Sequence, residues 1–145
     1  MHSRPSIGLF KVQLLRGDPP VCMLMHLFCS NPHQNKKNKF SYSIVGKMEG
    51  LRNLQAHTEI TSDYGDGRQL KDSLHFEQNQ FLFSNQSLKP ATFQLLIKLK
   101  GVSPRNQMFT AVLNIQLRYT LKKIYVISIA TKTAVKSVPS LALFQ

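Results

Sequence analysis

The chain has 145 residues, a length that fits one domain with a single core over residues 1–145. Hydrophobic residues make up 42% of it and charged residues 18%, which excludes an intrinsically disordered protein, because such proteins are poor in apolar residues. The 19 Lys and Arg against seven Asp and Glu give a net charge of +12, and no acidic residue follows Glu77. Such a chain attracts phosphates, either those of nucleic acid or those of anionic lipid headgroups, and charge alone does not decide between them.

Alternating residues and the turn formers between them predict strands over 7–15, 21–29, 40–47 and 54–61. The bounding stretches GDPP, NPHQNKKN and MEG supply Pro, Gly and Asn, which favour turns. Cys22 and Cys29 fall on one predicted strand, about 20 Å apart at the usual rise per residue, which is beyond disulfide reach. We therefore expect two buried thiols, and the cysteines do not decide the compartment.

The predicted loop NPHQNKKNKF carries the one true cluster of cations in the chain: Lys36, Lys37 and Lys39. These are the candidate anion-contact residues, and they make an anionic membrane surface a candidate partner. The other lysines are scattered, and the simpler explanation for them is that they keep a β-rich domain in solution.

Acidic residues gather only in SDYGDGRQLKDSLHF, residues 62–76. This stretch holds three of the seven carboxylates: Asp63, Asp66 and Asp72. A helix-loop-helix calcium site needs oxygen ligands at positions 1, 3 and 5 before its glycine, and the register set by Gly67 puts Tyr64 at position 3. A looser metal site built from the three aspartates stays open, but Asp-Gly is typical of hairpin turns. We expect a turn between strands and no metal site.

The residues that could serve catalysis are few. His57 and His75 lie on predicted strands, the second of them over 73–83, and nothing pairs with them at motif spacing. Gly-x-Ser-x-Gly, His-Glu-x-x-His, a phosphate-binding glycine loop and Cys-x-x-Cys are all missing from the sequence. We predict a protein that is not an enzyme, with no catalytic residue, no cofactor and no small-molecule substrate. The stretch SNQSLKP reads as a loop, and its Asn85 begins an N-glycosylation sequon.

The clearest periodicity lies in FTAVLNIQLRYTL, where apolar side chains occupy the odd positions from Phe109 to Leu121. Residues 92–100 repeat the pattern, and GVSPRNQ between the two segments is short enough for a turn. Together they predict a β-hairpin over 91–121. With a last strand over 124–131, the chain reads as all-β, an antiparallel β-sandwich of about seven to eight strands.

Apolar runs around 21–29 and 124–130 are the longest in the chain, and both are strand-sized, so we expect no membrane-spanning helix within these residues. Binders of single-stranded nucleic acid combine cationic grooves with exposed aromatic side chains. Here the phenylalanines share the inward parity of Leu and Ile, and Arg118 and Tyr119 are adjacent and point to opposite faces. We do not expect a nucleic acid partner.

Two segments, NLQAHTEITSDYGDGRQLKDSLHF and AVLNIQLRYTL, carry a partial resemblance to a known family. In that order they resemble the region between the membrane spans of the transmembrane protein 231 family, a family of the ciliary transition zone; the similarity covers about residues 51–140. The shared residues are Asn53, Leu54, Gln55, Asp66, Gly67, Asp72, Leu74, His75, Phe76, Val112, Leu113, Gln116, Leu117, Tyr119 and Leu121.

The resemblance implies a non-enzymatic structural and interaction module of the complex at the ciliary base, which supports ciliogenesis and the diffusion barrier of the cilium membrane. It implies other transition-zone proteins as partners, met by open edge strands, and a glycan on Asn85. The family has a spanning helix near each end, so we expect this chain to be a fragment or short isoform of a longer membrane protein. The rival hypotheses are a peripheral lipid-binding β-sandwich, using the loop lysines and the cationic C-terminal half, and a basic domain associated with nucleic acid.

Overall fold

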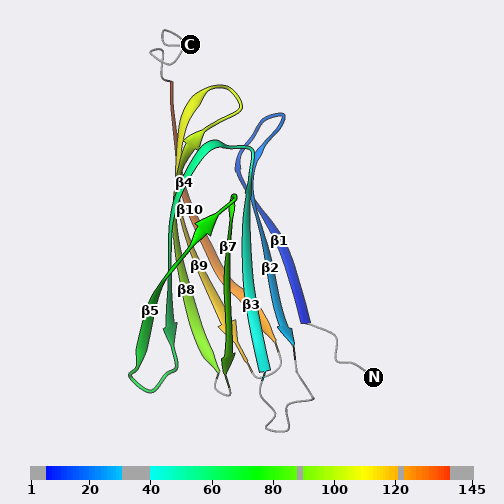
Figure 1. Ribbon diagram of the computed structural model, residues 1–145, viewed down its shortest axis with the longest axis vertical. Coiled ribbons are helices and arrows are strands. Elements are labelled where there is room, and N and C mark those ends of the chain that lie inside the picture. The colour runs from blue at the N-terminus through cyan, green and yellow to red at the C-terminus, as the bar shows by residue number, and fades with distance from the viewer. Residues whose placement is uncertain (1–5, 31–39, 88–89, 121–122, 138–145) are drawn as a thin grey trace.

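In the computed structural model, residues 6–30, 40–87, 90–120 and 123–137 are described. Every regular element in these ranges is a β-strand, and the strands form two five-stranded antiparallel sheets that pack face to face (Figure 1). The predicted antiparallel β-sandwich is confirmed. No helix occurs in the described ranges, and so none there is long and apolar enough to cross a membrane.

The first sheet has the strand order β1-β2-β3-β7-β6. Its strands are β1 (Ser6–Leu15), β2 (Val21–Ser30), β3 (Phe40–Glu49), β6 (Phe76–Glu77) and β7 (Gln80–Ser87). The second sheet has the order β10-β9-β8-β4-β5. Its strands are β4 (Arg52–Asp63), β5 (Gln69–Leu74), β8 (Ala91–Val102), β9 (Gln107–Tyr119) and β10 (Ile124–Ser137).

Strands β8 and β9 form the predicted hairpin, and their apolar and polar residues alternate because one face of each strand is buried. The odd-numbered residues of β8, and those of β9 from Phe109 onward, are buried, whereas the even-numbered residues face outward. The turn between the strands is closed by the buried Ser103, whose backbone N–H donates to the Gln107 carbonyl at 2.8 Å. Leu121, the last residue of the predicted apolar series, lies outside the described residues.

The core fills the space between the sheets. The second sheet contributes the inward side chains of β8 and β9, and the first sheet contributes mainly β2 and β3; the central residues, all exposed by 2% or less, are Met23, Met25, Leu27, Ile44, Phe93, Leu95, Ile97, Phe109, Leu113, Ile115 and Leu117. Phe83 of β7 meets Phe93 of β8 edge-on, with 6.2 Å between ring centroids, so the aromatic rings join the sheets directly.

The strand predicted over 73–83 is wrong, because the chain changes sheets there. β5 ends at Leu74, the two-residue β6 begins at Phe76, and Gln78 and Asn79 reverse the chain with positive φ angles of 53° and 65°. Gln and Asn carry a weaker turn signal than Gly or Pro, so the alternating composition on either side concealed the reversal.

The loop predicted over SNQSLKP is also wrong in its first half, because β7 continues to Ser87. Asn85 pairs with Tyr42 of β3 in this ladder, and the long neighbouring strand supplies backbone partners that outweigh the polar composition. The sequon therefore begins in a strand, and its glycosylation stays a prediction.

Candidate functional site

The acidic stretch forms the turn between β4 and β5, as predicted. The Asp63 carboxylate accepts a hydrogen bond from the Gly65 backbone N–H at 2.8 Å, and Asp66 accepts one from the Arg68 N–H at 3.1 Å. Gly65 and Gly67 have φ angles of 81° and 88°, which favour glycine. The Arg68 guanidinium also pairs with Asp66 at 2.8 Å, and this contact raises the pKa of Arg68. Both carboxylates therefore serve the turn.

The third aspartate, Asp72, is not part of that turn. It lies on β5 opposite Ile60, a buried residue, so its side chain is on the inward side of an edge strand, where it remains exposed. Across the described residues, no group of three His, Cys, Asp or Glu side chains is placed to hold a metal ion. Cys22 is buried as a free thiol on β2, as predicted; Cys29 lies on the same strand, and the burial of its side chain stays a prediction.

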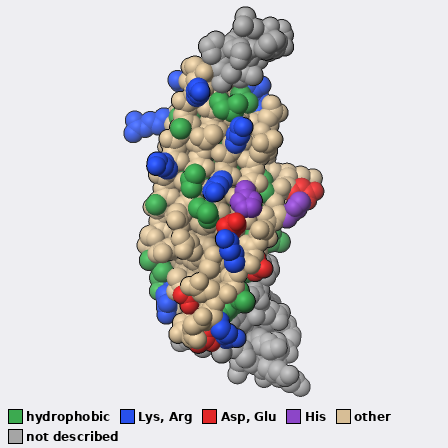
Figure 2. Space-filling view, turned by 90° about the vertical axis from the view of Figure 1, so that its left-hand side faces the viewer, with side chains coloured by type: hydrophobic (Ala, Val, Ile, Leu, Met, Phe, Trp, Pro, Cys, Tyr) green, Lys and Arg blue, Asp and Glu red, His purple; other side chains and the backbone are tan. Residues whose placement is uncertain are grey.

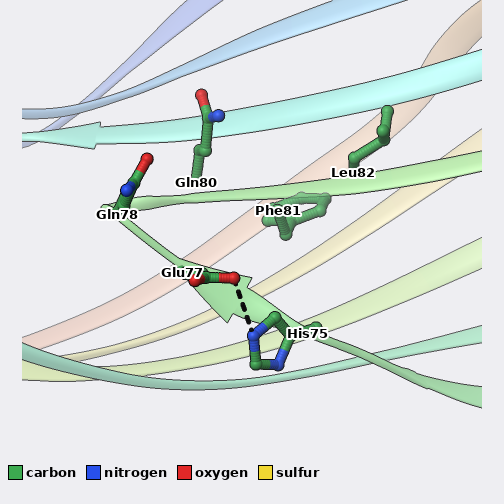
Figure 3. A pocket seen from close by; sticks show the side chains of 6 residues that line it. All are labelled: His75, Glu77, Gln78, Gln80, Phe81 and Leu82. Atoms are coloured by element: carbon green, nitrogen blue, oxygen red, sulfur yellow. Dashed lines mark hydrogen bonds and ion pairs between the residues drawn. The ribbon is translucent and has the colours of Figure 1, made fainter.

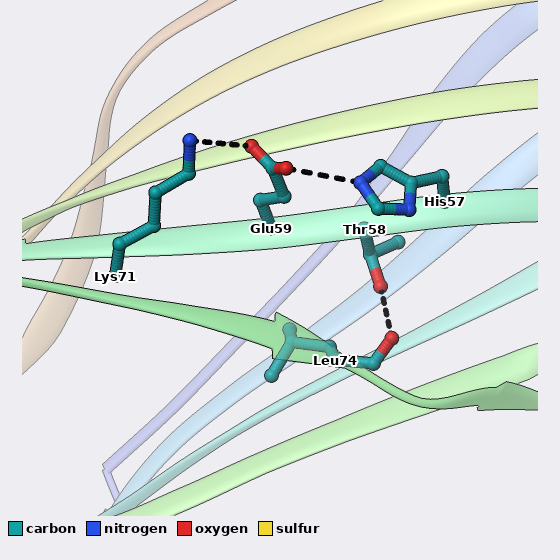
Figure 4. A network of polar contacts seen from close by, with 5 residues as sticks. All are labelled: His57, Thr58, Glu59, Lys71 and Leu74. Atoms are coloured by element: carbon teal, nitrogen blue, oxygen red, sulfur yellow. Dashed lines mark hydrogen bonds and ion pairs between the residues drawn. The ribbon is translucent and has the colours of Figure 1, made fainter.

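His57 belongs to a polar network on the outer face of β4 and β5 (Figure 4). Its Nε2 lies 3.0 Å from Oε2 of Glu59, while Lys71 Nζ lies 3.2 Å from Oε1 of the same carboxylate. Hydrogen bonds from His57 and Lys71 lower the pKa of Glu59, so this carboxylate stays ionised to more acidic pH than usual. Below, the Thr58 hydroxyl donates to the Leu74 carbonyl at 2.7 Å and ties β5 to β4. The network fastens two strands together.

His75 lines a surface hollow at the crossing between the sheets (Figure 3). The hollow is bounded by His75, Glu77, Gln78, Gln80, Phe81 and Leu82. His75 Nε2 lies 3.1 Å from Glu77 Oε2, and both side chains are exposed. No Ser, Thr, Cys or Lys is among these lining residues, so the described part of the hollow offers the imidazole no nucleophile to activate.

The remaining predicted site residues lie wholly or partly outside what the structure describes. Lys36, Lys37 and Lys39 lie outside the described residues, and of Asn85 the structure describes only the backbone. The anion-contact site predicted from the three lysines stays a prediction.

The most unusual feature of the molecule is β10, the edge strand of the second sheet. It is 14 residues long, and every residue from Ile127 to Ser137 is exposed, including Ile129 and Val135 at 38% each. Figure 1 shows this strand ending at the same end of the molecule as the β8–β9 turn. Only its beginning is packed, through the buried Ile124 and the partly buried Val126.

A β-bulge sets which side chains of β10 face inward. The register with β9 shifts between Val126 and Ser128, so inward residues are even-numbered before the bulge and odd-numbered after it. Ile129, opposite the buried Ile115, and Val135, opposite the buried Phe109, therefore point to the core side of the sheet. They are exposed nevertheless, because the first sheet does not cover this part of β10.

The other described edges of the sandwich differ from β10. β6 has two residues and β5 has six, and Asp72 points inward from β5, a charge that opposes pairing with another strand. β1 is longer, but its inward Phe10 and Val12 pack against the core. Of the described edges, β10 alone combines length with an uncovered apolar face.

The outer face beside β10 is cationic. Strands β8, β9 and β10 contain no acidic residue, and their outward positions carry five cations: Lys98, Lys100, Arg118, Lys132 and Lys136. Figure 2 views this side of the molecule, and its upper part shows blue side chains and no red ones. Apart from Asp63 at the turn, β4 places one carboxylate on this face. It is that of Glu59, which is already paired with His57 and Lys71.

Comparison with known proteins adds no relative. No family model, no curated protein and no solved structure matches this chain. The resemblance to the transmembrane protein 231 family stays a prediction.

The length of β10 was missed from the sequence, where the last strand was expected to end at residue 131. The signal was present, because Thr131, Thr133 and Val135 continue to alternate with Lys132 and Lys136. Such a polar stretch reads as a loop until its pairing with β9 is known.

Proposed function

We propose that this chain is a non-enzymatic interaction module that binds a partner protein by accepting an extended segment along the free edge of β10. One observation carries the proposal: β10 is a long edge strand whose residues are exposed on both faces from Ile127 onward. An edge strand presents unpaired N–H and C=O groups, and many proteins add a partner strand at such an edge.

The resemblance to the transmembrane protein 231 family extends this proposal to a place in the cell. The residues that carry the resemblance lie mainly on β4, the turn after it, β5 and β9, which belong to the same sheet as β10. The proposed module is a component of the ciliary transition zone, where it supports ciliogenesis and the diffusion barrier at the ciliary base. Its partners are other proteins of that complex.

Expression of the tagged chain in ciliated cells tests both parts. We expect enrichment at the ciliary base, and we expect the double variant Ile129→Lys/Val135→Lys to lose it, because inward charges on an edge strand block strand addition. The matched control is Leu9→Lys/Leu82→Lys, which makes the same change at exposed residues of the first sheet. Thermal unfolding of each purified variant checks that the fold is retained.

Each failure has its own meaning. A wild-type chain spread evenly through the cell contradicts the ciliary assignment. A chain that reaches the ciliary base equally well with and without the β10 lysines contradicts the role of this edge.

A further inference from the structure

The two faces of β10 beyond the bulge differ in chemistry. The outward residues Ala130, Lys132, Ala134 and Lys136 lie opposite even-numbered residues of β9, and the inward residues Ile129, Thr131, Thr133 and Val135 lie opposite odd-numbered ones. The outward row is small and cationic, and the inward row is uncharged with an apolar residue at each end. A segment that pairs with β10 meets both rows at once, because its own side chains alternate between the two faces.

Electrostatics decide which residues such a segment needs on its outward side. Lys132 lies in a row with Val112 of β9 and Lys98 of β8, so no acid stands between these two lysines across the sheet. Opposite charges on neighbouring strands stabilise pairing, whereas like charges oppose it. A segment with Asp or Glu on this side gains attraction from Lys132 and Lys136, and the field of the basic face adds to it.

On the other side the segment needs apolar residues. Ile129 and Val135 are each 38% exposed, and an apolar side chain laid beside them removes further apolar surface from water. We infer that β10 binds an extended segment of a partner protein in which acidic residues alternate with apolar ones. This inference rests on the proposed function and names the chemistry of the partner.

A second copy of the chain fits this edge poorly. If two β10 strands paired antiparallel about Ala134, Lys132 of each would lie opposite Lys136 of the other. Pairing centred on either lysine would place it opposite its own copy, whereas pairing about Thr133 would place both lysines opposite alanines, so it is the charge of the whole chain that disfavours a second copy in every register. The net charge of +12 on each chain adds a longer-range repulsion.

A phosphate surface would contact only some of the groups that β10 exposes. A lipid headgroup or a nucleic acid backbone would contact the lysines and leave the free backbone edge and the apolar row without a partner. An acidic-apolar strand satisfies the lysines, the apolar row and the edge together, which is why the observations favour it.

The test uses the full chain and a labelled synthetic peptide of about ten residues, the upper end of the usual strand lengths, in which Glu alternates with Val. Binding is followed by fluorescence anisotropy, and hydrogen exchange reports whether Ile127–Ser137 gain protection. We expect binding that weakens with added salt, protection along β10, and affinity roughly tenfold above that of a peptide with Lys in place of Glu.

Matched controls separate the causes. Lys132→Glu/Lys136→Glu should weaken binding by roughly tenfold, while Lys11→Glu/Lys47→Glu, which changes the net charge equally at exposed residues of the first sheet, should have a much smaller effect. A peptide of the same composition with its glutamates grouped in one half should bind more weakly, because alternation is lost. N-methyl groups at one of the two sets of alternate peptide residues should abolish binding, because they remove the N–H groups that face β10.

Several outcomes would overturn the inference. Equal binding of the grouped and alternating peptides, or binding unaffected by N-methylation at either set, means that charge alone is recognised. Preferential sedimentation with phosphatidylserine vesicles, dependent on Lys132 and Lys136, means a lipid surface instead, and a dimer that Val135→Lys dissociates means a second copy. No binding of the alternating peptide to the full chain overturns it as well.

A failure of this inference can be told apart from a failure of the proposed function. If the peptide fails but Ile129→Lys/Val135→Lys still removes the chain from the ciliary base, the edge binds a partner of different chemistry. If the peptide binds but those lysines leave localisation unchanged, the edge has the inferred preference and the proposed function fails.

Discussion

The ring of Phe81 occupies the space where Gly46 has no side chain. The two residues are opposite each other in the ladder of β3 and β7, both on the buried side, and a methyl group built at Gly46 would overlap the ring. Phe76 lies next to Phe81, with 6.3 Å between ring centroids. The glycine therefore lets an aromatic side chain lie flat against the sheet, and the need for it is spatial, since its φ angle is not positive.

Gly46→Ala should lower the free energy of unfolding by about 1–3 kcal/mol, because the new methyl group overpacks the site around Phe81. Urea denaturation of the purified variant measures this. Gly8→Ala is the matched control, because its methyl group would meet Leu27 at an ordinary 3.7 Å; it should leave stability unchanged or raise it by up to about 1 kcal/mol. An equal loss of stability in both variants would show that overlap with Phe81 is not what destabilises Gly46→Ala.

At the scale of elements, the turn between β6 and β7 is the least optimised connection. Gln78 and Asn79 both have positive φ, and Glu77 pairs with Gln80 around them, which is the geometry of a two-residue hairpin turn that prefers Asn-Gly. The Asn79 carbonyl accepts a hydrogen bond from the Met48 N–H at 2.8 Å, so the turn is also fastened to β3. Because that bond is made by the backbone, it survives a change of side chain.

Gln78→Asn/Asn79→Gly should raise the free energy of unfolding by about 0.5–1 kcal/mol, since these residues adopt the positive φ angles with less strain. Thermal and urea unfolding report the gain. Thr110→Gly, at an exposed and extended position of β9, should instead cost roughly 0.5–1 kcal/mol. A loss at the turn comparable to that at Thr110 would mean that the two positions do not need the turn conformation.

For the molecule as a whole, one core lies between the sheets and β10 extends past it. Ile115 and Ile129 show this most directly, because they face each other across the β9–β10 ladder and point to the same side of the sheet. Ile115 is completely buried, whereas Ile129 is 38% exposed. Two identical side chains in one cross-strand pair therefore differ in whether the first sheet covers them.

Ile115→Ala should lower the free energy of unfolding by about 2–5 kcal/mol, because it leaves a cavity in the core. Ile129→Ala should cost about 1 kcal/mol or less, because its side chain is only partly withdrawn from water. Urea denaturation at neutral pH compares them. Similar losses would mean that β10 is covered in solution, by a second copy or by another part of the chain.

The all-β class, the β8–β9 hairpin and the turn around Gly65 and Gly67 could all be predicted, because each depends on residues near one another in the chain. A period of two from Phe109 to Tyr119 leaves one apolar face that must be buried, and Asp-Gly supplies a local turn. The crossing at Leu74–Phe76 could not be predicted, because its cause is the pairing of β7 with β3, far away in the sequence.

The sequence by itself determined that alternating side chains would form strands with one buried face, and that the last three strands would carry no acid. Tertiary structure alone decided which strand lies at an edge and how far the opposing sheet reaches. The bulge after Val126 exchanges the two faces of β10, and the end of the first sheet leaves Ile129 and Val135 uncovered. Burial depends on what lies across the sandwich, and the residues of β10 themselves do not encode it.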